Sequence, residues 1–128
     1  MMLSKPIVFT LFLMLSLSVK SQPDFRDCSK EETTFSMREC ISKEYKIADT
    51  ELNKKYATLV TLLPPIGQET LKESQRAWIQ FRDTDCAWQA FQNYQGSLFY
   101  VITDSCFLEM TKKRVTDLQN NINYYRQQ

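Results

Sequence analysis

The chain has 128 residues, with 16 basic and 15 acidic side chains, a formal net charge of +1 and no histidine. A charge this close to zero gives no bulk electrostatic case for binding nucleic acid or an anionic membrane surface. The lack of histidine removes the commonest general base, the commonest metal ligand and every Ser–His or Cys–His catalytic pair. The composition therefore favours a protein that is not an enzyme and holds no metal and no cofactor.

Residues 1–21 have the order of a secretory signal peptide. Lys5 precedes an uncharged run, Ile7–Val19, and Val19-Lys20-Ser21 offers small or short side chains at the positions that signal peptidase reads. The run is shorter than the ~20 apolar residues that a membrane span needs. No cysteine directly follows it, so a lipid anchor is not indicated. We expect a periplasmic or secreted protein that begins near Gln22 and has no stable membrane anchor after cleavage.

Cleavage would leave one small domain, residues 22–128. Loss of Lys5 and Lys20 lowers the basic count from 16 to 14 against 15 acids, a net charge of −1. Four cysteines remain, which is an even number in an oxidising compartment and indicates two disulfides.

Three long helices are predicted, over residues 34–63, 68–93 and 98–125, and the only two glycines lie at their connections. The first segment carries one apolar stripe at steps of three and four residues, with Thr33 or Thr34 as its N-cap. The buried anchors expected in the second segment are Leu71, Trp78, Phe81 and Trp88. No stretch alternates with period two, so we expect an all-α, antiparallel three-helix bundle.

Short turns predict which positions lie at the same level of the bundle. If the first two helices fold back at the Pro64-Pro65 turn, Asp49 lies beside Arg82 and Asn53 lies beside Trp78. If the last two fold back at Gly96, Trp78 lies beside Arg114. Each expectation is loose by about one helical turn, ~5 Å. These five residues, Asp49, Asn53, Trp78, Arg82 and Arg114, are predicted to form a structural polar network.

The same fold-back argument favours one disulfide between Cys86 and Cys106, which leaves Cys28 and Cys40 for the other. Sequence alone still allows three connectivities. A redox or zinc role is the alternative, but the chain has no C-x-x-C motif and its cysteine spacing matches no usual zinc site.

Four carboxylates on the first two helices, Asp49, Glu51, Asp83 and Asp85, offer a catalytic alternative. Two of them ~5 Å apart could make a glycosidase acting on the cell wall. A structural interpretation is simpler: the carboxylates can form ion pairs that fix the register of the two helices, or can face water. Nothing else in the chain completes a catalytic site.

Three stretches of the chain are candidates for a binding function. Trp78 lies between Arg76 and Arg82, as in a ligand pocket, although a helix interface uses the same residues. The segment 93–100 is a candidate for contact with another macromolecule, and Tyr94, Ser97 and Tyr100 are its expected partner-binding residues. The Pro64–Gly67 turn is a second exposed candidate, and either loop can also be a plain connector.

Taken together, these positions resemble the LprI family of exported bacterial proteins, which is associated with inhibition of lysozyme. The matching positions run from the first cysteine to the end of the predicted core: Cys28, Cys40, Ala48-Asp49, Glu51-Leu52-Asn53, Tyr56, Gln75-Arg76-Ala77-Trp78-Ile79, Phe81-Arg82-Asp83, Cys86, Gly96-Ser97, Cys106, Thr111, Arg114 and Leu118.

The resemblance implies a protein partner, lysozyme, which the chain would bind and block. Family members are often lipid-anchored, whereas this chain lacks the anchoring cysteine. An interaction or envelope-stress module that never touches lysozyme is the alternative function. The partner itself and the oligomeric state stay open at this point.

Overall fold

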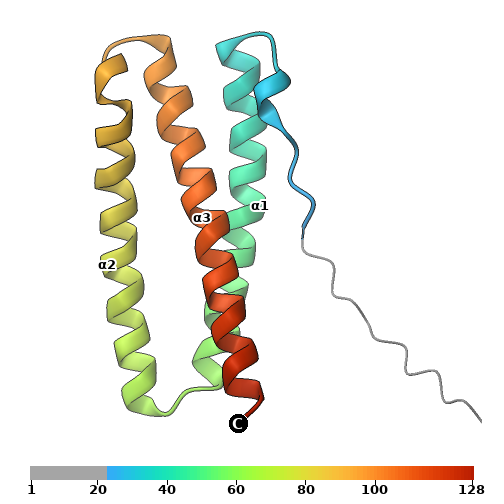
Figure 1. Cartoon of the computed structure of the whole chain (residues 1–128), viewed down its shortest axis with the longest axis vertical. Helices are drawn as coiled ribbons and strands as arrows, with labels where there is room; N and C mark the ends of the chain where they lie inside the picture. Colours follow the sequence, from blue (N-terminus) through green and yellow to red (C-terminus); the bar gives the residue numbers. More distant parts are fainter. Residues whose placement is uncertain (1–22) are drawn as a thin grey trace, which may run out of the picture.

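The computed structural model describes residues 23–128, and the expected leader, residues 1–21, lies outside the described part. Three long helices make up the domain: α1 (Thr34–Thr61), α2 (Pro65–Ala90) and α3 (Ser97–Arg126). Two short 3-10 helices, η1 (Cys28–Lys30) and η2 (Phe91–Asn93), precede α1 and follow α2. Each long helix runs antiparallel to the next, and the described residues contain no strand (Figure 1). The predicted all-α, three-helix fold is confirmed.

The helix ends follow local chemistry. Thr33 caps α1, because its Oγ1 accepts a hydrogen bond from the Ser36 backbone N–H at 3.0 Å. Pro64 is the N-cap of α2 and Pro65 its first residue, so this helix starts three residues before the predicted Gln68. Proline fits this position because it lacks an N–H that the first turn would leave unpaired.

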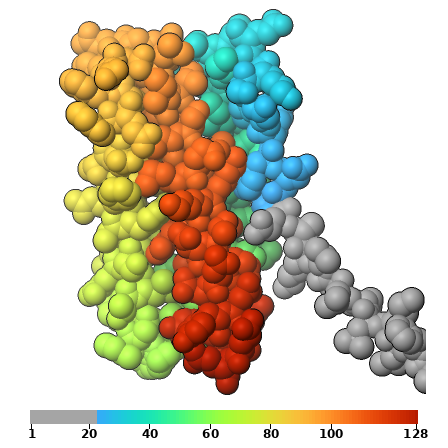
Figure 2. Space-filling model, viewed as in Figure 1, coloured from blue at the N-terminus to red at the C-terminus, as the bar shows by residue number. Residues whose placement is uncertain are grey.

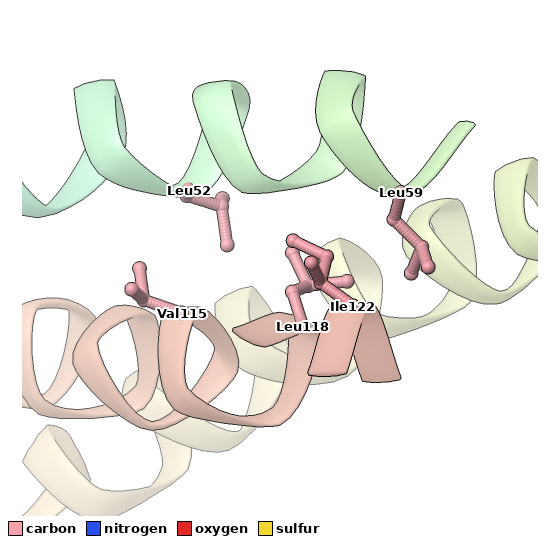
Figure 3. Close-up of a cluster of buried hydrophobic side chains, with 5 residues drawn as sticks. All are labelled: Leu52, Leu59, Val115, Leu118 and Ile122. Atoms are coloured by element: carbon pink, nitrogen blue, oxygen red, sulfur yellow. The ribbon is translucent and has the colours of Figure 1, made fainter. Parts of the chain in front are cut away.

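The main core lies between α1 and α3. Leu52 and Leu59 of α1 meet Val115, Leu118 and Ile122 of α3, and all five side chains are buried (Figure 3). The α2 helix adds to this cluster only with partly buried side chains, Leu71 and Trp78 among them. A second cluster of Ile41, Ala48 and Leu108 extends the α1–α3 contact toward the N-terminal end of both helices.

The α2 helix packs mainly on one neighbour. It lies against α3, whereas α1 and α2 scarcely touch outside their connection. Leu71 and Trp78 are partly buried as predicted, but Phe81 and Trp88 are 57% and 72% exposed. The expectation that these two aromatic residues are buried anchors is therefore wrong. The physical reason is that a single neighbour covers a narrow stripe of a helix, and both residues lie outside that stripe.

Both predicted disulfides are present. Cys86–Cys106 joins α2 to α3, with the two Cα atoms 5.5 Å apart. Cys28–Cys40 joins the N-terminal segment to α1, with a Cα–Cα distance of 5.7 Å. No cysteine of the described part is free.

The N-terminal segment is also held without covalent bonds. The Arg26 backbone N–H donates to Oε2 of Glu44 at 3.0 Å, which gives this buried carboxylate a partner. Phe25 packs against the second core cluster, and the Lys112 ammonium lies 4.6 Å from the centre of its ring. The segment thus lies along α1 and α3 as part of the folded domain.

Candidate functional site

Arg82 links all three helices at the middle of the domain. Its guanidinium carbon lies 5.2 Å from the ring centre of Trp78 and 5.1 Å from that of Phe107. Its Nη1 donates to Tyr45 Oη at 3.1 Å, and Nη2 pairs with Asp83 Oδ1 at 2.8 Å. An arginine stacked on two rings and paired in this way has its charge satisfied. These contacts indicate a structural role for Arg82.

The predicted pairing of α1 with α2 is wrong in detail. Arg82 takes Asp83 as its ion-pair partner in place of Asp49. Asp49 instead accepts hydrogen bonds from Asn53 Nδ2, at 2.9 Å to its backbone oxygen and 3.3 Å to its carboxylate. Because α1 and α2 scarcely touch, Arg82 bridges to α1 through the longer side chain of Tyr45, one turn before Asp49.

The predicted proximity of Trp78 and Arg114 is present, with 5.7 Å between the guanidinium carbon and the ring centre. Arg114 also donates to Gln75 Oε1 at 3.0 Å and to Ser74 Oγ at 3.4 Å. Burial lowers the pKa of the Arg114 guanidinium, an effect that the nearby Asp117 opposes. Arg114 therefore fastens α3 to the N-terminal half of α2.

The candidate carboxylates each have a partner on their own helix. Glu51 pairs with Lys54 and Lys55 at 3.7 and 3.9 Å, and Asp85 accepts from Gln89 Nε2 at 2.8 Å. Asp49 and Asp83 have the local partners given above. Across residues 23–128, no group of three or more acidic or cysteine side chains could hold a metal ion. This arrangement favours the structural interpretation of the four carboxylates.

A row of aromatic rings covers the end of the domain where α2 turns into α3. The Tyr94 and Phe99 rings meet edge to face with centres 5.7 Å apart, and the Phe99 and Tyr100 rings do so at 5.4 Å. Both tyrosines are exposed, and Ser97 begins α3 beside them. The structure thus brings together the three residues that the sequence predicts for partner binding.

Arg38 of α1 extends this row across to the neighbouring helix. Its guanidinium carbon lies 4.8 Å from the Tyr100 ring centre, and its Nε donates to Asp104 Oδ2 at 3.1 Å. Sequence reasoning missed both Arg38 and Asp104. The predicted fold-back of the first helix onto the second, combined with that of the second onto the third, makes α1 parallel to α3. It places Arg38 and Asp104 within about two helical turns of each other along the bundle, which is the signal that could have found this contact.

An open hollow of about 650 Å³ lies between the first turns of α1 and α3. Three cationic side chains and one acidic side chain are among the residues that line it: Thr34, Phe35, Arg38, Glu39, Ser42, Lys43, Lys46, Ser97 and Tyr100. We call this hollow together with Tyr94 and Phe99 the end surface. The first turns of α1 and α3 lie side by side at one end of the molecule (Figure 2).

The loop that carries Tyr94 holds one residue in the left-handed region. Gln95 has a φ of 69°, and it is the single non-glycine residue of the described part with a positive φ. Replacing Gln95 with glycine should raise the free energy of unfolding by about 0.5–1 kcal/mol, because glycine adopts this conformation without a Cβ clash. Urea unfolding followed by circular dichroism measures the change.

The matched control is Gln92→Gly, which should lower stability because Gln92 has no such strain to relieve. Equal destabilisation by both variants would contradict the strain at Gln95.

Fold and site together define a class of small, all-α, disulfide-bonded proteins that present aromatic and charged side chains on a rigid helical frame. Residues 26–118 match the family described as lysozyme inhibitor LprI, and the chain belongs to this family. Its two disulfides and its family indicate an extracytoplasmic protein, and the family is one of inhibitors, which imply a protein partner. Within residues 23–128, no helix has the length and apolar character that crossing a membrane requires.

Two relatives are similar over different shares of the chain. "Uncharacterized protein R02472" of Rhizobium meliloti (strain 1021) is 29% identical over 123 residues, which cover 86% of this chain and 88% of the relative. "Uncharacterized protein YecT" of Escherichia coli (strain K12) is 32% identical over 77 residues, or 48% of each chain. No solved structure matches the chain.

Proposed function

We propose that the protein binds a lysozyme outside the cytosol and blocks it with the end surface. Membership of the LprI family is the observation that carries this proposal. The end surface supports it because it combines exposed aromatic side chains with a net positive rim, on elements that a disulfide and several hydrogen bonds hold in place.

The charge of the rim suits the chemistry of the target. Lysozymes cleave glycan chains with two carboxyl groups in a cleft. Arg38, Lys43 and Lys46 line the hollow of the end surface with one acid, Glu39, and Arg38 is also paired with Asp104, so cations exceed acids by one. A cationic rim therefore complements an acidic cleft and accelerates the encounter of the two proteins.

The aromatic row supplies the contact area. Buried tyrosine and arginine side chains dominate the binding energy of many protein interfaces. Tyr100 is 53% exposed, and its ring is already oriented by Phe99 and Arg38. Such preorganisation lowers the entropy lost on binding.

The test is cell-wall lysis by several classes of lysozyme in the presence of the full chain, expressed with its leader and purified from the cell envelope. Inhibition should saturate near one inhibitor per lysozyme. Tyr100→Ala should raise the inhibition constant about 30-fold or more, which corresponds to ~2 kcal/mol for an interface anchor. Raising the salt concentration should slow association, because the rim charges are screened.

Tyr124→Ala is the matched control, since Tyr124 is 60% exposed and lies at the opposite end of the same helix. It should inhibit as the unchanged protein does. The proposal fails if no class of lysozyme is inhibited at a large molar excess, or if Tyr124→Ala weakens inhibition as much as Tyr100→Ala.

A further inference from the structure

A second stripe of exposed residues runs along α2 and into the first residue of η2, on the side away from the main contact with α3. It consists of exposed, uncharged side chains spaced alternately three and four residues apart: Ser74, Ala77, Phe81, Thr84, Trp88 and Phe91. We call this stripe the outer seam. Alternating steps of three and four are the spacing by which one helix packs along another.

Apart from Ser74, whose Oγ accepts a hydrogen bond from Arg114 Nη2, the outer seam lies away from the rest of the domain. Cys86 and Ala90 are fully buried against α3, whereas Trp88, between them in sequence, is 72% exposed. At about 100° per residue, Trp88 lies about 160° around the helix from each of them. The α2 helix forms one flank of the molecule, with α3 on its inner side (Figures 1 and 2). The seam is therefore available to another molecule.

We propose that the outer seam joins two copies of this chain in an antiparallel, two-fold symmetric dimer. An axis that passes between Arg82 and Asp83 pairs all six seam residues with one another. Across this axis every aromatic ring faces a small side chain: Phe91 faces Ser74, Trp88 faces Ala77, and Phe81 faces Thr84. Large side chains opposite small ones fill space without clashes, which is what close helix packing requires.

A second copy fits the seam better than a charged partner does. The stripe itself carries no charge; of the acids beside it, Asp83 and Asp85 have partners in Arg82 and Gln89, and Glu73 lies at its N-terminal end. A two-fold interface needs a patch that complements itself, and the pairing above meets that condition.

The length of the seam sets the expected affinity of the dimer. Its 17 residue steps, from Ser74 to Phe91, span about 26 Å. A contact of this length buries an area at the low end of the range for specific interfaces. We therefore expect a dimer that dissociates in the micromolar range. None of the seam residues lines the end surface, so this proposal can fail without the inhibitor proposal failing.

Sedimentation velocity of the purified protein between about 1 and 500 µM tests the dimer directly. The unchanged protein should shift from monomer to dimer over this range. Trp88→Glu should remain monomeric throughout, because it places a charge in the seam. Phe35→Glu is the matched control and should dimerise normally, since Phe35 is equally exposed, at 72%, but lies on α1.

A charge pair tests the register. Ala77→Glu and Trp88→Lys should each abolish the dimer alone, and the double variant A77E/W88K should restore it because the two positions face each other. A77E/F91K should stay monomeric, since Phe91 faces Ser74. Circular dichroism confirms that each variant is folded. A monomer at every concentration, or a dimer that Trp88→Glu leaves intact, would overturn the proposal.

Discussion

Replacing Cys86 and Cys106 together with alanine should lower the free energy of unfolding by about 3 kcal/mol and release α2 from the rest of the domain. The bridge spans 20 residues, and closing a loop of this length restricts the unfolded chain by about that amount. For a small domain with a total stability of about 5–15 kcal/mol, this is a large share.

The structural consequence should be concentrated in α2. This helix packs mainly on α3 and exposes most of its surface, so few other contacts resist its opening. We expect the α2 backbone amides to lose hydrogen-exchange protection by more than the amides of α1 and α3. Hydrogen exchange followed by mass spectrometry of peptic fragments resolves the three helices.

The other disulfide provides the control. Cys28–Cys40 spans 12 residues, so its removal should cost nearly the same free energy in the entropic account. Its removal should loosen the segment before α1, however, and leave α2 as protected relative to α3 as before. If both double variants expose α2 equally, the one-sided packing of α2 does not control its stability.

Leu118→Ala should lower the free energy of unfolding by about 3–4 kcal/mol, the range typical of a fully buried leucine. Leu118 is 1% exposed. It packs in one buried cluster with Leu52 and Leu59 of α1 and with Val115 and Ile122 of its own helix (Figure 3). The missing methyl groups would leave a cavity in the contact that holds the bundle together. Urea unfolding measures the change.

Leu98→Ala is the control in the same helix. Leu98 is 48% exposed, so the variant should lose less than about 1 kcal/mol. A loss at Leu118 no larger than that at Leu98 would show that the α1–α3 core is not the main source of stability.

Much of the fold follows from local patterns in the sequence. The apolar steps of three and four, the Pro64-Pro65 pair and Gly96 place all three helices to within a few residues. The predicted turn at Gly96 also places Cys86 beside Cys106 and Trp78 beside Arg114, because a short connection leaves little freedom in level. That argument favours the Cys86–Cys106 disulfide and leaves Cys28 and Cys40 for the other, and the structure has both.

The candidate site was predicted in part. Tyr94, Ser97 and Tyr100 were expected from loop composition, and the structure sets them in one surface. Sequence reasoning misses Arg38, which belongs to that surface, and its ion-pair partner Asp104, 66 residues away, since their meeting depends on how α1 lies along α3. The prediction that Phe81 and Trp88 are buried is wrong, because the hydrophobicity of a residue does not show whether a neighbouring helix is present to cover it.

Helix positions and turn positions are thus determined by the sequence itself, because each depends on short-range chain geometry. Only the tertiary structure decided that α3 is the central helix, that Arg82 pairs with Asp83 and Tyr45, and that the outer seam of α2 stays exposed to solvent. Those features depend on which of the possible helix pairs share the limited apolar surface of a small domain. Here α1 and α3 share most of it, and α2 receives the remainder.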